Sequence, residues 1–323
     1  MPQFDMDISA LESYLPPRPE PLDFDSFWHE RIREAEAWPV DATYSVVDPG
    51  FSELVVEDVT FRGYGGETVK GWMIRPRHRV GLLPTIVTFI GYGTGRGFPG
   101  EYTSLASAGY AQFVMDNRGQ GTADTPDGAF GPHVGGYLTQ GIEDPKSYYY
   151  SRLFIDAVRA VEAAAAHPSV DLNAIFVMGG SQGGGIALAA AGLLPMTTGG
   201  RSFRGAMIDV PFLSHVRRAV RLVDTLPYRE IAEYLQRRTD REERAFATLD
   251  YFDGMNFAAR SSVPALFSVG LMDDICPPSA VYASYNHYSG QKSLAVYPFS
   301  GHGNFGEFQH QRQRRFIRET LQP

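Results

Sequence analysis

Residues 175–188, which read IFVMGGSQGGGIAL, constrain the fold of this chain more than any other segment. A short apolar run at residues 175–178 is typical of a buried strand, and the small and apolar residues from 184 to 194 are typical of a packed helix. Between them lies a G-x-S-x-G pentapeptide with Ser181 at its centre. Its glycines let strand and helix approach closely, while the turn holds the serine in a strained backbone conformation with its hydroxyl exposed. We therefore expect a sharp strand–turn–helix unit that presents Ser181 as a nucleophile.

From residue 83 onward, short apolar strands alternate with helices, which predicts a mostly parallel, doubly wound α/β sheet. The expected strands are residues 84–90, 110–116, 174–178, 205–210, 263–270 and 293–297, and the expected helices are 103–108, 148–166, 183–194 and 305–321. Two alternating stretches upstream, 52–62 and 68–75, predict an antiparallel hairpin that opens the sheet. A strand, a G-x-S-x-G turn and a helix in such a sheet form the nucleophile elbow of an α/β-hydrolase.

Three segments lie outside this alternation. Residues 1–40 form a proline-rich extension with one amphipathic helix, DFDSFWHERIREAEAW, which we expect Asp25 or Ser26 to cap. Residues 119–145 carry turn signals with no periodicity and predict a long loop. Residues 212–260 hold about three helical patterns with paired charges and predict a helical insertion that covers the strand ends, before the strand that precedes the acid. We interpret all 323 residues as a single α/β domain.

Composition excludes several functions. The chain has 29 basic and 37 acidic side chains, a net charge of −8, which disfavours nucleic acid or an anionic membrane as its partner. No apolar run approaches the roughly 20 residues that span a bilayer, and the opening MPQFDMDISA is acidic where a signal peptide is basic. Cys276 is the one cysteine, so no disulfide can form within the chain and a cytoplasmic location is expected. Its place beside two prolines indicates a small buried residue rather than a nucleophile.

A serine nucleophile needs a base, itself oriented by a carboxylate, and in α/β-hydrolases the acid and then the histidine follow the serine. His302 follows the last expected strand, at the carboxyl edge where open parallel sheets place their ligands, and is the expected base. His215 and His310 lie in helical patterns where solvated faces are expected, and His287 lies near a helix end.

The acid should lie at the end of the preceding strand, where Asp273 and Asp274 are adjacent. Spacing alone does not separate them, because a turn can point either one inward. Asp116 also ends a strand, but it precedes the serine and so breaks the expected order. We interpret Asp116 as structural, paired with nearby backbone or a basic group.

The tetrahedral intermediate needs two N–H donors at the oxyanion position. One is the backbone N–H of Gln182, the residue after the nucleophile, and the other comes from the loop after an earlier strand, where Tyr92 or a close neighbour is the candidate. The glycines of residues 91–97 lack the spacing and the later acidic residue that a dinucleotide-binding loop requires.

Taken together, the motifs resemble carbohydrate esterase family seven, the acetyl xylan esterases and cephalosporin C deacetylases. The resemblance covers nearly the whole chain and rests on RGQG, GGSQG, YYYSRLFIDAVRAVE, YFDGMNFAAR and SVGLMDDICPPSAV. It implies Ser181 as nucleophile, His302 as base, Asp273 as acid and the amides of Tyr92 and Gln182 as the oxyanion hole. It further implies that Arg118, Gly119 and Gln120 form a scaffold near the site, that no metal or cofactor takes part, and that the chain assembles into a ring-like hexamer.

Two features depart from the family pattern. Gly303 stands where the family usually has Glu after the catalytic histidine, so that support is missing or comes from elsewhere, with Glu307 as a candidate. Residues 121–132 form a shorter stretch than the family loop that contributes to subunit contacts.

The expected function is the removal of acetyl groups from small carbohydrate-type esters. A serine peptidase or amidase of the same fold and a non-catalytic binding module are the alternatives. Four bulky side chains near the site predict little room beyond an acetyl methyl group: Tyr92, Phe212, Pro227 and Tyr228. The residues do not identify the natural acetylated alcohol or show whether polymeric xylan can enter.

Overall fold

The computed structural model describes residues 3–128, 131–200, 203–303 and 305–322. Within this part of the chain, nine strands form one sheet in the order β1-β2-β3-β5-β4-β6-β7-β8-β9. The strands are β1 (Thr43–Val47), β2 (Leu54–Arg62), β3 (Thr68–Pro76), β4 (Leu83–Phe89), β5 (Ala111–Met115), β6 (Val170–Gly180), β7 (Gly205–Asp209), β8 (Ala265–Gly270) and β9 (Lys292–Tyr297). The helices are α1 (Ile8–Glu12), α2 (Phe24–Glu36), α3 (Thr103–Ser107), α4 (Tyr149–Ala166), α5 (Gln182–Leu193), α6 (Val216–Leu222), α7 (Tyr228–Arg237), α8 (Glu242–Leu249), α9 (Gly254–Ala258), α10 (Pro278–His287) and α11 (Gly306–Leu321).

The first three strands and β5 pair antiparallel, and the strands from β5 across to β9 pair in parallel. This confirms the expected α/β-hydrolase architecture with an antiparallel opening. β1 was not expected, because its short sequence TYSVV lies on the sheet edge and buries no residue that would give a clear alternation. In the parallel part, Phe89 lies opposite Gly179 and Gly180 opposite Asp209, so β4, β6 and β7 all end at one edge of the sheet.

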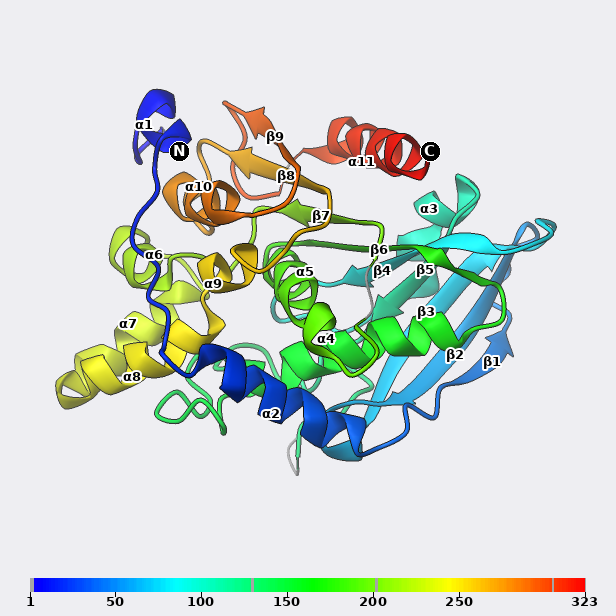
Figure 1. Ribbon diagram of the computed structural model, residues 1–323, viewed down its shortest axis with the longest axis horizontal. Helices are drawn as coiled ribbons and strands as arrows, with labels where there is room; N and C mark the ends of the chain where they lie inside the picture. Colours follow the sequence, from blue (N-terminus) through cyan, green and yellow to red (C-terminus); the bar gives the residue numbers. More distant parts are fainter. Residues whose placement is uncertain (1–2, 129–130, 201–202, 304, 323) are drawn as a thin grey trace.

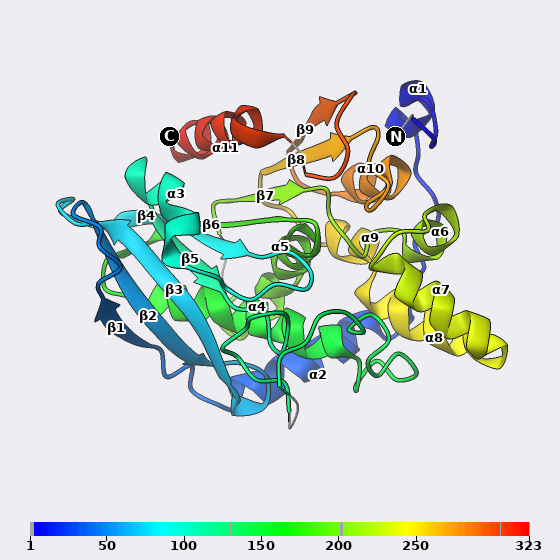
Figure 2. The same ribbon diagram turned by 180° about the vertical axis from the view of Figure 1, so that it is seen from behind.

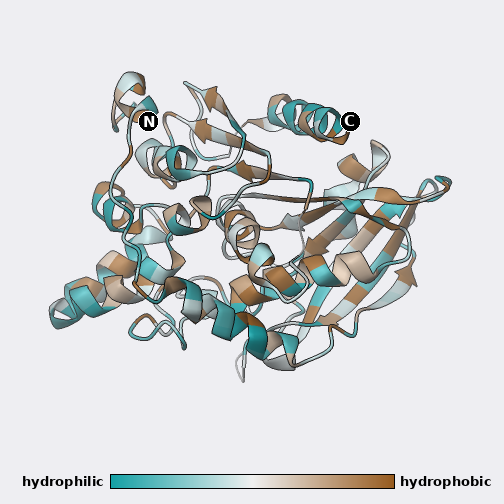
Figure 3. Ribbon diagram, in the orientation of Figure 1, coloured by the Kyte–Doolittle hydropathy of each residue, from teal (hydrophilic) through white to brown (hydrophobic). Residues whose placement is uncertain are grey.

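Helices cover both faces of the sheet (Figures 1 and 2). On one face, α4 and α5 pack on the central strands within the large apolar core, which includes Val177 of β6. On the other face, Leu105 of α3 and Ile317 of α11 belong to a smaller apolar cluster with Phe176, the neighbour of Val177 in β6. Successive residues of a strand point to opposite faces, which explains this alternation. Brown apolar segments run through the central strands in Figure 3, whereas teal residues lie along the outer sides of α2 and α11.

The N-terminal helix α2 forms where the sequence predicts it, and Trp28 and Ile32 on its apolar face are buried. Neither expected cap is correct, because Asp25 and Ser26 both lie inside the helix. Asp23 occupies the cap position without a side-chain bond to the helix, and the Ser26 hydroxyl donates to its carbonyl at 2.9 Å. The apolar spacing identifies the helix, but neither of the two candidate caps identifies its first turn.

The insertion at residues 212–260 contains four α-helices, α6 to α9, rather than three. The expected long loop is also present, and its described residues contain no helix or strand. Within it, the backbones of residues 119–121 and His133 form two hydrogen bonds of 2.8 and 3.0 Å. Among the described helices, none is both long and apolar enough to cross a membrane.

Candidate active site

Ser181 lies in the sharp turn between β6 and α5 with φ 58° and ψ −122°, a conformation that L-residues rarely adopt. A Cβ atom on Gly179 would lie 2.2 Å from the carbonyl oxygen of Gly183, and one on Gly183 would lie 2.2 Å from the carbonyl oxygen of Phe89. Gly179 and Gly183 are therefore required by close approach of backbone to backbone. The structure confirms the predicted sharp strand–turn–helix unit around Ser181.

The backbone of Ser181 is held from both sides by the segment that follows β7. Its N–H donates to the Asp209 carbonyl at 3.0 Å, and its carbonyl accepts from the N–H of Phe212 at 2.9 Å. Added Cβ atoms on Gly184 and Gly185, in the first turn of α5, would lie 2.4 and 2.3 Å from the carbonyl oxygens of Asp209 and Phe212. The insertion thus begins in direct backbone contact with the nucleophile turn.

His302 and Asp273 form the expected pair. His302 Nδ1 lies 2.9 Å from Asp273 Oδ2, and Oδ1 of the fully buried Asp273 accepts the N–H groups of Ile275 and Cys276, each at 2.9 Å. Asp274 is not in this pair, and its carbonyl accepts the Thr225 hydroxyl instead. The structure therefore places Asp273, and not Asp274, against the imidazole, and His302 and Ser181 line the same cavity.

The other histidines are not bonded to Asp273. His310 is exposed, as expected, although it lines the cavity beside Ser181. His287 Nε2 lies 2.7 Å from the carbonyl oxygen of Pro16. The expectation of a solvated helix face for His215 is wrong: the residue precedes α6 with φ 43° and packs 3.4 Å from the Tyr14 hydroxyl. Burial, with Arg218 nearby, lowers the pKa of His215 to about 4.

Asp116 has the structural role predicted for it. Its carboxylate accepts backbone N–H groups of Arg96, Asp124 and Thr125 at 2.6, 2.9 and 2.8 Å. Burial raises the pKa of this carboxyl despite those bonds. Asp116 thereby ties the loop after β4 to the start of the long loop.

Gln182 is the first residue of α5, so its N–H is one of those without an acceptor inside the helix. Its buried side chain accepts from the Tyr150 hydroxyl and from Gln120 Nε2, each at 2.9 Å, and donates to the carbonyl of Gly91 at 3.2 Å. Gln120 Oε1 in turn accepts the N–H of Gly93 at 2.7 Å. The two glutamines therefore fix both sides of the loop that carries Tyr92.

Tyr92 is held at its far end by a residue that sequence reasoning missed. Its hydroxyl donates to Glu230 Oε1 at 2.7 Å and accepts the N–H of Tyr137 at 3.0 Å. Glu230, in the first turn of α7, also accepts the N–H groups of Gly136 and Leu138 at 2.8 and 3.1 Å. Burial and this carboxylate raise the pKa of Tyr92. No signal in the sequence identifies Glu230, rather than Glu233 on the same helix, as the partner of Tyr92.

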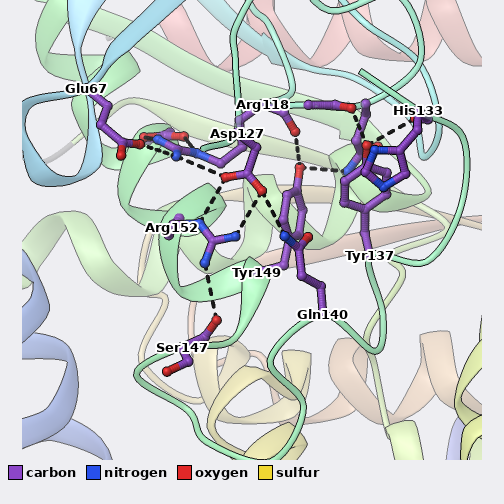
Figure 4. A network of polar contacts seen from close by, with 12 residues as sticks. Glu67, Arg118, Asp127, His133, Tyr137, Gln140, Ser147, Tyr149 and Arg152 are labelled. Atoms are coloured by element: carbon purple, nitrogen blue, oxygen red, sulfur yellow. Dashed lines mark hydrogen bonds and ion pairs between the residues drawn. The ribbon is translucent and has the colours of Figure 1, made fainter. Parts of the chain in front are cut away.

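Arg118 is the centre of a buried ionic network under the long loop (Figure 4). Its guanidinium makes a two-bond pair with the buried Asp156 at 2.6 and 2.9 Å and an ion pair of 2.6 Å with Glu67. Its carbonyl accepts the hydroxyl of Tyr149 at 2.7 Å, and the same hydroxyl accepts from Gln120 at 2.9 Å. Arg118 therefore supports Gln120 from behind, as a scaffold.

A small cavity of about 140 Å³, here named the Ser181 cavity, lies beside the nucleophile. Its lining includes Ser181, Asp209, Val210, His302, Phe305 and Gln309. Cys276 is buried close by with its thiol in hydrogen-bonding reach of the Ser181 side chain, and burial raises the pKa of this thiol. The expected support from Glu307 is absent, because that exposed carboxylate pairs with Arg314.

Of the four bulky residues predicted near the acyl group, three form a continuous aromatic row. The ring of Phe212 lies 6.5 Å from that of Tyr92 and 4.4 Å from that of Tyr228, and Pro227 is buried beside Tyr228. In the described residues, no group of three or more His, Cys, Asp or Glu side chains is arranged to hold a metal ion.

A nucleophile elbow, a histidine–carboxylate pair and an N–H-bearing loop at the carboxyl edge of a mostly parallel sheet define an α/β-hydrolase. Residues 1–320 match the model of a single family, acetyl xylan esterase (AXE1), and the chain belongs to that family of carboxylic ester hydrolases.

Solved structures agree with this assignment. An acetyl xylan esterase from Paenibacillus sp. R4 is 38% identical with a TM-score of 0.90, covering 98% of this chain and 100% of that one. Acetyl xylan esterase 1 from Thermoanaerobacterium sp. JW/SL YS485 is 31% identical with a TM-score of 0.88, covering 99% and 100%.

Acetyl esterase Axe7A of Xylanibacter ruminicola is 28% identical over 309 residues, which cover 89% of this chain. The chain spans 64% of the length of that relative.

Proposed function

We propose that this protein is a serine esterase that removes acetyl groups from small carbohydrate-type esters. The observation that carries the proposal is the Asp273–His302 pair, which lines one cavity with the strained Ser181. The family of the chain agrees with acetyl esters as the substrate.

In the proposed reaction, Ser181 Oγ attacks the acetyl carbonyl while His302 Nε2 takes the hydroxyl proton. Asp273 holds the imidazole through Nδ1 and stabilises the imidazolium that forms. The backbone N–H groups of Gln182 and Tyr92 bind the oxyanion. His302 then protonates the leaving alcohol, and water activated by the same histidine releases acetate from the serine. No metal or cofactor enters any step.

The volume of the Ser181 cavity, about 140 Å³, supports a small acyl group. The row of Tyr92, Phe212 and Tyr228 is not among the described residues that line this cavity, and it adjoins the nucleophile turn through the N–H of Phe212, which donates to the Ser181 carbonyl. A longer acyl chain that reaches packed side chains must displace them, and overpacking costs about 1–3 kcal/mol, or roughly tenfold to over a hundredfold in rate.

The test is kcat/KM for p-nitrophenyl acetate, butyrate and octanoate, followed by acetylated xylo-oligosaccharides and cephalosporin C. We expect a steep fall from acetate to butyrate and negligible turnover of octanoate. Ser181→Ala is the control and should retain less than about a thousandth of the rate, since losing a triad member costs several powers of ten. A flat or rising profile would overturn the deacetylase proposal, and preferred cleavage of acyl-peptides would replace it with a peptidase.

We also propose two properties that follow from the family resemblance and from composition. The chain should form a homo-oligomer, a hexamer by resemblance, which sedimentation analysis would test. A single buried cysteine suits the reducing cytoplasm. Locating the protein in fractionated cells would test that compartment.

A further inference from the structure

Asp209, the last residue of β7, connects the nucleophile turn to the last helix. Its carbonyl accepts the N–H of Ser181. Its carboxylate accepts the Ser268 hydroxyl at 2.7 Å and the side-chain amides of Gln309 and Gln313, each at 2.6 Å. All three donors to the carboxylate are neutral, and no described basic side chain forms an ion pair with it.

The bond to Gln309 leads to the loop that carries His302. Gln309 Oε1 accepts the hydroxyl of Tyr297, the last residue of β9, at 2.8 Å. The ring of Tyr297 stacks on that of Phe305, with centroids 4.2 Å apart and an interplanar angle of 14°. Tyr297 and Phe305 stand before and after the turn that contains His302, so this stack closes the turn and Gln309 anchors it to Asp209.

Asp209 and Gln309 also face the reacting groups, because both line the Ser181 cavity together with Ser181 and His302. Asp209 is not a second orienting acid, since Nδ1 of His302 is already bonded to Asp273. Asp209 can therefore influence the reaction through the main chain of Ser181 and through the turn that carries His302.

The charge on Asp209 does not serve stability. Burial raises the pKa of this carboxyl to about 6 despite three hydrogen bonds, so folding disfavours its ionised form. Asp253 shares this shift, so what distinguishes Asp209 is its place at the junction of the two reacting segments.

We propose that Asp209 is a positioning residue for hydrolysis, which sets the His302 imidazole relative to Ser181 through Gln309 and the Tyr297–Phe305 stack. The inference rests on the proposed esterase function. It assigns to Asp209 a role in kcat and not in substrate binding.

The test compares Asp209→Ala with Asp209→Asn, using kcat and KM for p-nitrophenyl acetate per active site titrated with a fluorophosphonate. Asp209→Ala should lower kcat by about 30- to 100-fold with KM changed less than about twofold, because a displacement near 1 Å can cost about a hundredfold. Asp209→Asn should recover most of that loss, since its oxygen can still accept from Ser268 and Gln309, and the Gln313 amide can rotate so that its oxygen accepts from the new N–H.

Asp253 provides a matched control. It is buried, burial raises its pKa to about 6, and it accepts the backbone N–H groups of His215, Val216 and Met255 at 2.8 to 3.0 Å in the insertion. Asp253→Ala should lower the thermal midpoint without changing kcat per titrated site.

A double-mutant cycle completes the test. Asp209→Ala/Gln309→Ala should have the kcat of the more impaired single variant, because both residues act through one connection. Where Asp209→Ala folds poorly, Gln309→Ala alone should still lower kcat per titrated site. Unchanged kcat per titrated site in both Asp209→Ala and Gln309→Ala would overturn the positioning role while leaving the esterase intact. Full activity of Ser181→Ala would instead overturn the esterase proposal itself.

Discussion

On the oxyanion side of the site, residues 90–94 are held by many short bonds from Gln120, Asn117, Gln182 and Glu230, and a buried ionic network lies behind them. On the histidine side, the turn after β9 is held by the His302–Asp273 pair, by the N–H of Met272 on the Ser300 carbonyl at 3.1 Å, by one stacked ring pair and by the path through Gln309 to Asp209. Both sides end at the same sheet edge, but the buried network around Arg118 lies behind the oxyanion side.

This difference matches what each side must do in the proposed reaction. Oxyanion donors are effective when they are already in place and need no rearrangement as charge develops. The histidine must accept a proton from one group and deliver it to another, so a turn with glycines at 301, 303 and 306 suits it better than a rigid network. The comparison indicates that rigidity in this site is concentrated where charge forms.

The largest expected effect on kcat comes from a substitution on the histidine side. Asp273→Asn should lower kcat on the order of 10⁴-fold, because the wrong imidazole tautomer is then favoured. Asp274→Asn should lower it by less than about tenfold, since that side chain is not bonded to His302. Steady-state kinetics with p-nitrophenyl acetate would show this, and the reverse order would transfer the role to Asp274.

The next effect removes the support behind the oxyanion side. Arg118→Met leaves the buried Asp156 without its partner, and breaking such a pair costs about 3–5 kcal/mol of unfolding free energy. Urea unfolding would measure it. Arg221→Met is the matched control, because its ion pair with Glu242 is exposed and should change stability by less than about 1 kcal/mol. Equal losses in the two variants would contradict the buried network's importance.

A smaller effect on kcat is expected from substitutions on the oxyanion side. Glu230→Gln weakens three bonds to one carboxylate and should lower kcat about tenfold, equivalent to about 1.4 kcal/mol of transition-state stabilisation. Tyr92→Phe should have a similar effect, and the double variant should be no worse than the more impaired single variant. Glu233→Gln, on the same helix but bonded to exposed Arg229, is the control and should be neutral. Additive losses would mean that Glu230 and Tyr92 act independently.

The smallest effect concerns pH and stability. Asp209 and Asp253 both have a folded-state pKa raised to about 6 by burial. Between about pH 4 and 6, the folded protein therefore holds more protons than the unfolded chain, so these groups make it more stable as pH falls. From pH 7 to 5, wild type should gain on the order of 1 kcal/mol relative to Asp253→Asn. Unfolding in urea at both pH values measures the difference, and parallel curves would contradict it.

The regular parts of this molecule are predictable because their causes are local. The elbow around Ser181 follows from two glycines and a strand–helix pattern, and the parallel strands follow from apolar runs of the right length. The order of the acid and the histidine along the chain identifies His302, and Asp116 is correctly set aside by the same rule.

The remaining features depend on partners distant in sequence. The backbone of one turn determines that Asp273, and not Asp274, faces His302. The residue types in that turn do not show which of the two points inward. Glu230 gains its importance from loops more than 90 residues away, and Asp209 from helix α11, 100 residues away. His215 is removed from solvent by the N-terminal segment, which no periodicity in its own helix reflects.

The Ser181 cavity has a further consequence for attempts to change its specificity. Gly180, Gly303 and Gly306 form part of its wall, and Gly184 and Gly185 beneath it are pressed against main chain. These glycines have no side chain that could be shortened. Apart from the residues assigned a role above, the cavity could be enlarged by trimming Val210, His310 or Phe305, and Phe305 also closes the histidine turn. Redesign for larger substrates would thus begin at Val210 or His310.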